Sequence, residues 1–161
     1  MNSRPSIYIP VKTYIKAFYI SKYGNEPVFF PKRDKINYLL SMLLNKTPAD
    51  IKEELPDREN TMEIKIPYFD HMNINVFNYL SARSKKTFER RLRQRFWVAY
   101  EDDMEKMLRE GLTPGDAVAL FIEKNNLPDD ETTEGTLRKE IYRVKKLYSV
   151  LQKRPYKLQK S

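Results

Sequence analysis

Lysine and arginine supply the chain's most distinctive chemistry, because they are clustered rather than spread evenly. Residues 83–100 carry seven Lys/Arg and one glutamate, residues 101–137 carry eleven Asp/Glu and three Lys/Arg, and residues 138–161 carry nine Lys/Arg and one glutamate. These blocks net +6, −8 and +8, within a formal total of +8 for 161 residues. Two cationic blocks favour contact with a polyanion, where each neutralised phosphate releases counterions. The competing interpretation is that the blocks are solvated helix faces of an ordinary basic protein.

Residues suited to catalysis are few. His71 is the only histidine and no cysteine is present, so a histidine-rich metal site and thiolate catalysis are excluded. With four glycines, the chain holds no Gly-rich phosphate loop. Pro56-Asp57 followed by Glu63-Ile64-Lys65 is similar to the Pro-Asp…Glu-x-Lys pattern of Mg²⁺-dependent nucleases, in which two carboxylates hold the metal and lysine assists the attacking water. We predict a non-enzymatic protein without catalytic residues, metal site or cofactor, and such a nuclease stays an open alternative.

The N-terminal half is expected to hold short strands that stop at proline. Residues 7–10, 28–31 and 64–67 each place β-branched or aromatic residues directly before proline, which lacks the N–H for a ladder bond. Helical spacing follows each segment: over 11–24 with Gly24 as terminator, over 36–44, and in a weaker third helix carrying Ile74, Phe77 and Leu80. We therefore expect a small α/β lobe over residues 1–82.

Residues 83–161 are expected to form a helical, basic lobe, either separate or sharing one core with the first. Apolar residues from Phe88 to Leu108 predict an amphipathic helix of about 25 residues that starts at Ser84. Thr113-Pro114-Gly115-Asp116 predicts a second start, and a last helix from Thr132/Thr133 carries an apolar seam from Leu137 to Leu151. The predicted fold class is α+β, mostly helical: small N-terminal strand-helix units, a long basic helix and a C-terminal helix-turn-helix-like pair.

Helix periodicity indicates which cations face solvent. On the long helix the arginines are expected to lie away from the apolar side. On the last helix, the residues opposite the seam are expected to occupy the first two turns, where base contacts usually fall. The predicted nucleic-acid-binding residues are Arg138, Lys139, Tyr142, Arg143, Lys145, Lys146, Arg83, Lys86, Arg90, Arg91, Arg93 and Arg95, with Lys153, Arg154 and Lys157 as further phosphate contacts. The connection 125–133 is longer than a helix-turn-helix normally has, and its Asp129-Asp130-Glu131 must face away from DNA.

One resemblance covers most of the chain. The order of an Ile-Pro strand, the turn Lys-Tyr-Gly-Asn-Glu-Pro-Val, a basic helix and the module Phe-Ile-Glu-Lys-x-x-Leu…Leu-Arg-Lys-x-x-Tyr-Arg resembles small uncharacterised proteins carried by bacteriophages and mobile elements. The resemblance implies a phage or mobile-element context and a helix-turn-helix-like C-terminal module. It assigns no catalytic residue.

These observations lead to two function hypotheses. The first is a nucleic-acid-binding protein, with duplex DNA favoured over RNA, acting as a transcriptional regulator or architectural factor of a phage or mobile element. The alternative is a structural or assembly protein, a virion component or oligomeric adaptor, that uses its charged blocks for self-association into a homo-oligomer. No stretch approaches the roughly 18 apolar residues of a membrane span, and the N-terminus lacks the apolar segment of a signal peptide, so we expect a cytoplasmic protein without a membrane partner.

Overall fold

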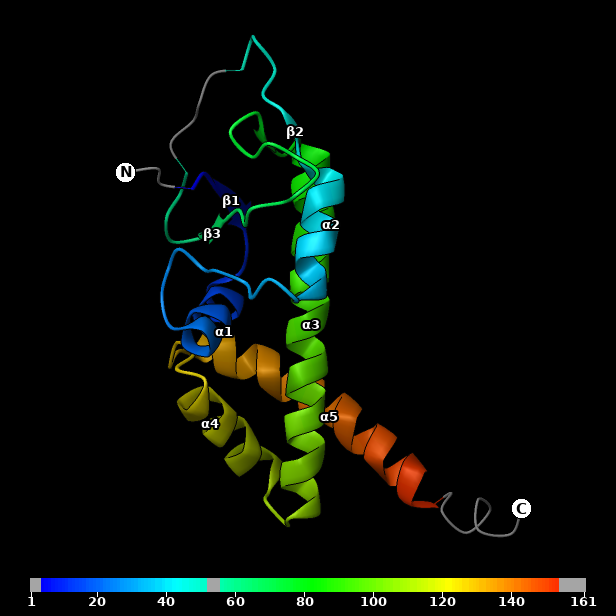
Figure 1. Ribbon diagram of the computed structural model, residues 1–161. Helices are drawn as coiled ribbons and strands as arrows, with labels where there is room; N and C mark the ends of the chain where they lie inside the picture. The colour runs from blue at the N-terminus through cyan, green and yellow to red at the C-terminus, as the bar shows by residue number, and fades with distance from the viewer. Residues whose placement is uncertain (1–3, 52–55, 154–161) are drawn as a thin grey trace, which may run out of the picture. The chain divides into compact units, whose positions relative to one another are not determined.

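The chain is an α+β protein that divides into two compact units. The computed structural model describes residues 4–51 and 56–153, with side chains as far as Lys146. Within these residues it has five helices and two antiparallel sheets of two strands each (Figure 1). The units are Met1–Gln94 and Arg95–Ser161. Their boundary falls inside the longest helix rather than at its start, where the charge pattern placed the division between lobes.

The first unit is built on a short sheet. β1 (Ser6–Pro10) pairs antiparallel with β3 (Thr61–Lys65), so that Ile7 lies opposite Ile64. Strand alternation buries one face of this pair, and that face carries Ile7, Ile9, Met62 and Ile64. Of the three segments predicted as strands, the first is confirmed and the third begins earlier, at Thr61. The second contributes only an isolated parallel bridge from Val28 to Ile64, because Pro27 and Pro31 remove ladder donors on both sides.

Two of the three helices predicted in this unit are confirmed. α1 (Thr13–Tyr23) is capped at its C-terminus by Gly24, whose φ of 95° suits glycine. α2 (Lys35–Leu43) is capped at its N-terminus by Asp34, whose side chain accepts a hydrogen bond from the backbone N–H of Ile36. Aromatic side chains of α1 pack against Phe30, in the connection that leads to α2. Tyr19 packs edge-on against Phe30 at a centroid distance of 6.0 Å, and Tyr23 does so at 5.0 Å.

The prediction of a third helix around Ile74, Phe77 and Leu80 is wrong. β4 (Phe77–Tyr79) pairs there with β2 (Asn45–Lys46), and residues 66–76 contain no helix. The asparagines explain the difference. The side chain of Asn73 accepts a hydrogen bond from the backbone N–H of Asn75 at 3.0 Å, a local turn that competes with helical bonding.

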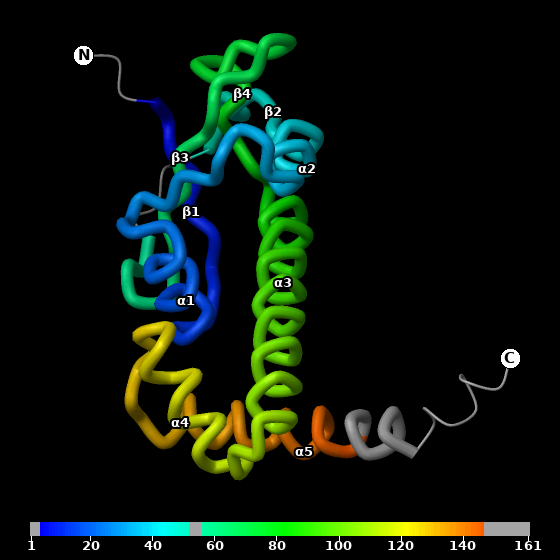
Figure 2. The backbone as a smooth tube through the Cα atoms, turned by 60° about the horizontal axis from the view of Figure 1, so that its bottom comes forward, coloured from blue at the N-terminus to red at the C-terminus, as the bar shows by residue number. Residues whose placement is uncertain are grey.

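α3 (Ala82–Arg109) is one unbroken helix of 28 residues that belongs to both units (Figure 2). In the first unit its Phe88 and Leu92 are fully buried, and the buried hydroxyl of Tyr19 donates to the carbonyl of Leu92 at 2.6 Å. In the second unit its buried residues are Phe96, Tyr100 and Met104. The helix ends at Arg109, and Gly111, whose φ is 90°, lies in the turn that follows.

The second unit adds two helices to the end of α3. α4 (Pro114–Lys124) starts as predicted: the Thr113 hydroxyl accepts from the backbone N–H of Asp116, and proline opens the helix. α5 (Glu131–Lys153) buries Leu137, Ile141 and Val144. Phe121 of α4 packs edge-on against Tyr100 at 5.0 Å, and the Tyr100 hydroxyl donates to the Leu137 carbonyl. Among the described helices, none combines the length and apolar character needed to cross a membrane.

The Tyr19 hydroxyl is the feature of the first unit most open to a simple test. Tyr19→Phe removes the buried hydrogen bond to Leu92 while keeping the ring, so we expect the free energy of unfolding to fall by about 1 kcal/mol. Urea unfolding followed by far-UV circular dichroism measures this change. Tyr38→Phe is the matched control, because Tyr38 is 72% exposed on α2. Equal stabilities for the two variants would contradict the role given to the Tyr19 hydroxyl.

Candidate nucleic-acid interface

The cations of α3 in the first unit lie mainly on one side of the helix. Arg83, Lys86, Arg90 and Arg93 are exposed and follow one another at steps of three, four and three residues. Such steps place side chains in a row along a helix, here about 15 Å long. The buried Phe88 and Leu92 hold the opposite side. We call this row of four residues the α3 cationic stripe.

Most of the stripe's charge is not neutralised by the residues that the structure describes. Arg83, Lys86 and Arg90 form no ion pair with any described residue, whereas Arg93 pairs with Glu89 at 3.6 Å. The Arg93 side chain is 48% exposed, and an exposed i,i+4 pair of this kind contributes little. The stripe is thus available to an external anion.

The other two arginines predicted on this helix are placed differently. Arg91 is exposed but lies beside the stripe. Arg95 is only partly exposed and takes part in other interactions, so it is not counted in the stripe. The reason for its lower exposure is its position seven residues after Phe88, since two helical turns return a side chain to the buried side.

A second cationic surface lies on α5. Lys139, Tyr142, Arg143 and Lys146 are exposed on the side opposite Leu137, Ile141 and Val144, and recur at three- and four-residue steps. We call this group the α5 cationic face. The two remaining predicted residues are exposed outside it: Arg138 is paired with Glu134 at 2.9 Å, and Lys145 has an interaction of its own.

The first turns of α5 are acidic, which corrects the predicted placement of the base-contacting residues. The helix begins at Glu131 rather than Thr132/Thr133, so Arg138 is its eighth residue and the first two turns carry Glu131 and Glu134. The connection after α4 is correspondingly shorter, spanning 125–130. The Asp130 carboxylate accepts a hydrogen bond from the backbone N–H of Thr133 at 2.7 Å. Backbone and side-chain hydrogen bonds from Thr133 hold the pKa of Asp130 below its usual value.

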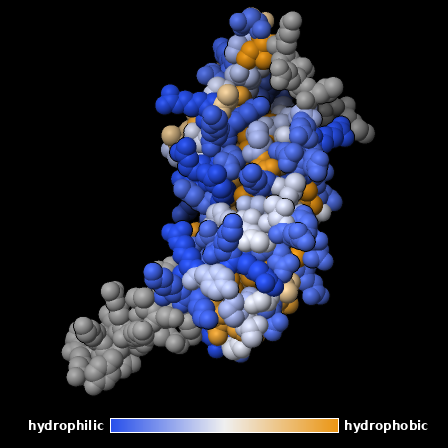
Figure 3. All heavy atoms as spheres, turned by 180° about the vertical axis from the view of Figure 1, so that it is seen from behind, coloured by the Kyte–Doolittle hydropathy of each residue, from blue (hydrophilic) through white to orange (hydrophobic). Residues whose placement is uncertain are grey.

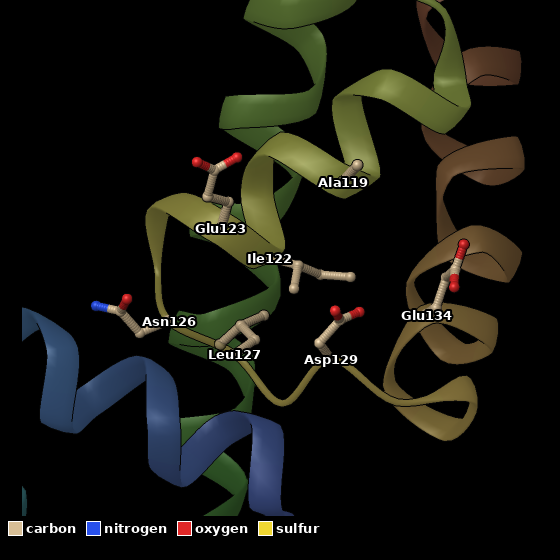
Figure 4. Close-up of a pocket in the computed structure, with 7 residues that line it drawn as sticks. All are labelled: Ala119, Ile122, Glu123, Asn126, Leu127, Asp129 and Glu134. Atoms are coloured by element: carbon tan, nitrogen blue, oxygen red, sulfur yellow. The ribbon is translucent and has the colours of Figure 1, made fainter.

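A shallow pocket of about 480 Å³ lies beside this acidic start (Figure 4). Ala119, Ile122 and Leu127 give it apolar lining, and Glu134 faces Asp129 from α5. Its carboxylates would repel phosphate, so we place the pocket outside the candidate interface. Within the 129–131 segment, Asp130 therefore caps α5 and Asp129 lines the pocket.

Part of the predicted interface lies beyond what the structure describes. This applies to the proposed phosphate contacts Arg154 and Lys157, and to the side chains of Lys153 and of the seam residues Tyr148 and Leu151. On the face seen in Figure 3, the described surface is mostly hydrophilic, with hydrophobic residues scattered over it.

The nuclease-like residues are engaged in other contacts. Glu63 and Lys65 do share one face of β3, as predicted. However, the Glu63 carboxylate accepts from the Tyr8 hydroxyl at 3.0 Å, and the Lys65 ammonium donates to the Arg4 carbonyl at 2.9 Å. Asp57 accepts hydrogen bonds from Asn60 and Glu59, which lower the pKa of its carboxyl group. No group of three acidic or histidine residues in the described part of the chain is arranged to hold a metal ion.

One cluster was not anticipated from the sequence. The guanidinium of Arg4 contacts the rings of both Phe29 and Tyr68, residues far apart along the chain. Strand alternation from the buried Ile7 and Ile9 could have placed Arg4 on the outer face of the sheet. Its aromatic neighbours depend on tertiary structure.

No protein-family model, curated protein or solved structure matches this chain.

Proposed function

We propose that the protein binds duplex DNA through the α3 cationic stripe and the α5 cationic face. The observation that carries this proposal is the α3 cationic stripe, in which Arg83, Lys86 and Arg90 are aligned, exposed and without an acidic partner among the described residues. Solvated helix faces usually alternate signs of charge, whereas this one presents a single sign.

The stripe has the chemistry of a phosphate contact. Each arginine offers forked donors that match phosphate oxygens, and a lysine adds a point charge. Duplex DNA places one negative charge per roughly 1.7 Å of helix axis, so a row of cations can neutralise several phosphates and release their counterions. Such contacts supply affinity and position, without sequence information.

The α5 cationic face is the better candidate for reading bases. In this proposal α4 and α5 act as a helix-turn-helix-like pair, and the middle of α5, rather than its acidic first turns, enters the major groove. Arg143 can pair with a guanine edge there, and Tyr142, 69% exposed, can contact a sugar or base. The deep, narrow major groove of RNA does not admit a helix face, which favours DNA.

This activity suits a transcriptional regulator or architectural factor of a phage or mobile element, working in the cytoplasm. The sequence resemblance supports that context, and the two separate cationic surfaces support either role. Base preference at α5 distinguishes a regulator from an architectural factor, which binds through the backbone alone.

Removing the charges of the α3 cationic stripe tests the proposal. For the triple variant Arg83→Gln/Lys86→Gln/Arg90→Gln we expect weaker duplex binding and a plot of log affinity against log salt that is shallower by about 0.9 for each phosphate that the variant no longer neutralises. Fluorescence anisotropy over a salt series measures both quantities. Arg109→Gln is the matched control, because Arg109 is an exposed α3 arginine already paired with Glu105 at 2.5 Å.

An unchanged salt slope in the triple variant would contradict the stripe's role. Self-association through opposite charges, the alternative function, also depends on salt. Sedimentation of the free protein under the same conditions is therefore the control: a mass that grows as salt is lowered would favour the assembly protein.

Substitution on α5 tests base reading separately. Arg143→Ala is expected to relax the base preference by about 1–3 kcal/mol at one position of the site. Arg138→Ala should change it little, since Arg138 is already paired with Glu134. Selection of binding sites from a random duplex pool measures the preference. If Arg143→Ala selects the same sites as the unmodified protein, α5 is not the reading helix.

A further inference from the structure

The outer face of the β1–β3 sheet carries aromatic and cationic side chains. Because Ile7, Ile9 and Ile64 point inward, Tyr8, Glu63 and Lys65 belong to the opposite face. The pairing of the two strands continues before Ser6, because the backbone N–H of Ile66 donates to the carbonyl of Pro5 at 3.0 Å. Arg4 is an even number of residues from Tyr8, so it belongs to the same outer face.

Phe29 is brought to this face by the bridge at Val28. The Val28 N–H donates to the Glu63 carbonyl at 2.8 Å, and the Lys65 N–H donates to the Val28 carbonyl at 2.9 Å. Val28 itself is buried, so the next residue, Phe29, points outward. The backbone thus holds the Phe29 ring beside β3.

Arg4 links two exposed rings into one cluster. Its guanidinium carbon is 5.0 Å from the centroid of Phe29 and 4.3 Å from that of Tyr68. Both distances lie within the range of cation–π contacts, which fix the rings and the cation relative to one another. Even so, Phe29 remains 43% exposed and Tyr68 56% exposed, so each ring keeps surface for a further partner.

Charge is divided along this face. The end with the aromatic rings carries Arg4 and Lys65, whose ammonium donates to the Arg4 carbonyl. The other end carries the pair formed by Tyr8 and Glu63, together with Glu26, whose carboxylate accepts from the Glu63 N–H and pairs with Lys16 at 3.4 Å. An anionic ligand with a flat ring would therefore settle at the Arg4 end, away from the carboxylates.

We propose that Arg4, Phe29 and Tyr68 form a binding site for the unpaired bases of single-stranded nucleic acid. A base stacks on the exposed surface of Phe29 or Tyr68, and the adjoining phosphate is neutralised by Arg4. Aromatic side chains bind any base in this way, because every base has a π face. The inference goes beyond duplex binding by α3 and α5 and does not depend on it, since it uses a different surface and unpaired bases.

The experiment compares two probes of equal length, labelled oligothymidylate and an abasic oligonucleotide with the same backbone. The double variant Phe29→Leu/Tyr68→Leu keeps apolar bulk but removes both rings. We expect it to lose about tenfold or more in affinity for oligothymidylate and to bind the abasic strand as the unmodified protein does. Tyr38→Leu, an exposed tyrosine of α2, is the matched control and should leave both affinities unchanged. Should the double variant fail to fold by circular dichroism, Tyr68→Leu alone replaces it, because Tyr68 lies outside the strands.

Three results would overturn the inference. They are equal affinity of the unmodified protein for the two probes, unchanged oligothymidylate binding by the ring variant, and an equal loss for both probes, which would assign the effect to charge. Duplex affinity is measured alongside and should be unaffected in the ring variant. A protein that stacks oligothymidylate but fails to bind duplex DNA would support this site while refuting the proposed function.

Discussion

Burial of Phe88 and Leu92 sets the orientation of α3, and the candidate interface depends on that orientation. Each residue advances the helix by about 100°. If the residues next to Phe88 and Leu92 were buried in their place, the helix would be rotated by that angle and the cations would turn toward the core. The Tyr19 hydroxyl reinforces the register by donating to the Leu92 carbonyl. Because the apolar side is fixed, Arg83, Lys86, Arg90 and Arg93 align on the exposed side. A packing constraint in the first unit thereby produces a charged surface.

The acidic segment between the cationic blocks has structural uses that its charge alone does not reveal. Asp116 follows the Thr113 cap of α4, and Asp130 caps α5, where carboxylates are favoured by the positive helix end. Glu134 holds Arg138 through an ion pair. Among the described side chains of α5, the positive charge left for a partner is consequently concentrated at Lys139, Arg143 and Lys146. These roles separate the charges that stabilise helices from those available to DNA.

Helix positions could be predicted from the sequence because apolar spacing and capping residues are local signals. Gly24 and Thr113 marked helix ends correctly, and the α3 and α5 seams identified exposed cations other than Arg95. The segment around Phe77 was misassigned, since its pairing with β2 is non-local and its asparagines form turns. The Arg4 cluster was missed for the same reason: Phe29 and Tyr68 approach Arg4 only after β1, β3 and the Val28 bridge have formed.

Contact between the α3 cationic stripe and duplex DNA is tested most directly by lysine acetylation, followed by mass spectrometry, with and without DNA. Lys86 is the only lysine of the stripe, and the exposed Lys106 lies on the same helix beyond the charge reversal. We expect DNA to protect Lys86 from acetylation while Lys106 reacts as before. Equal reactivity of Lys86 in the free protein and in a saturated DNA complex would contradict the account.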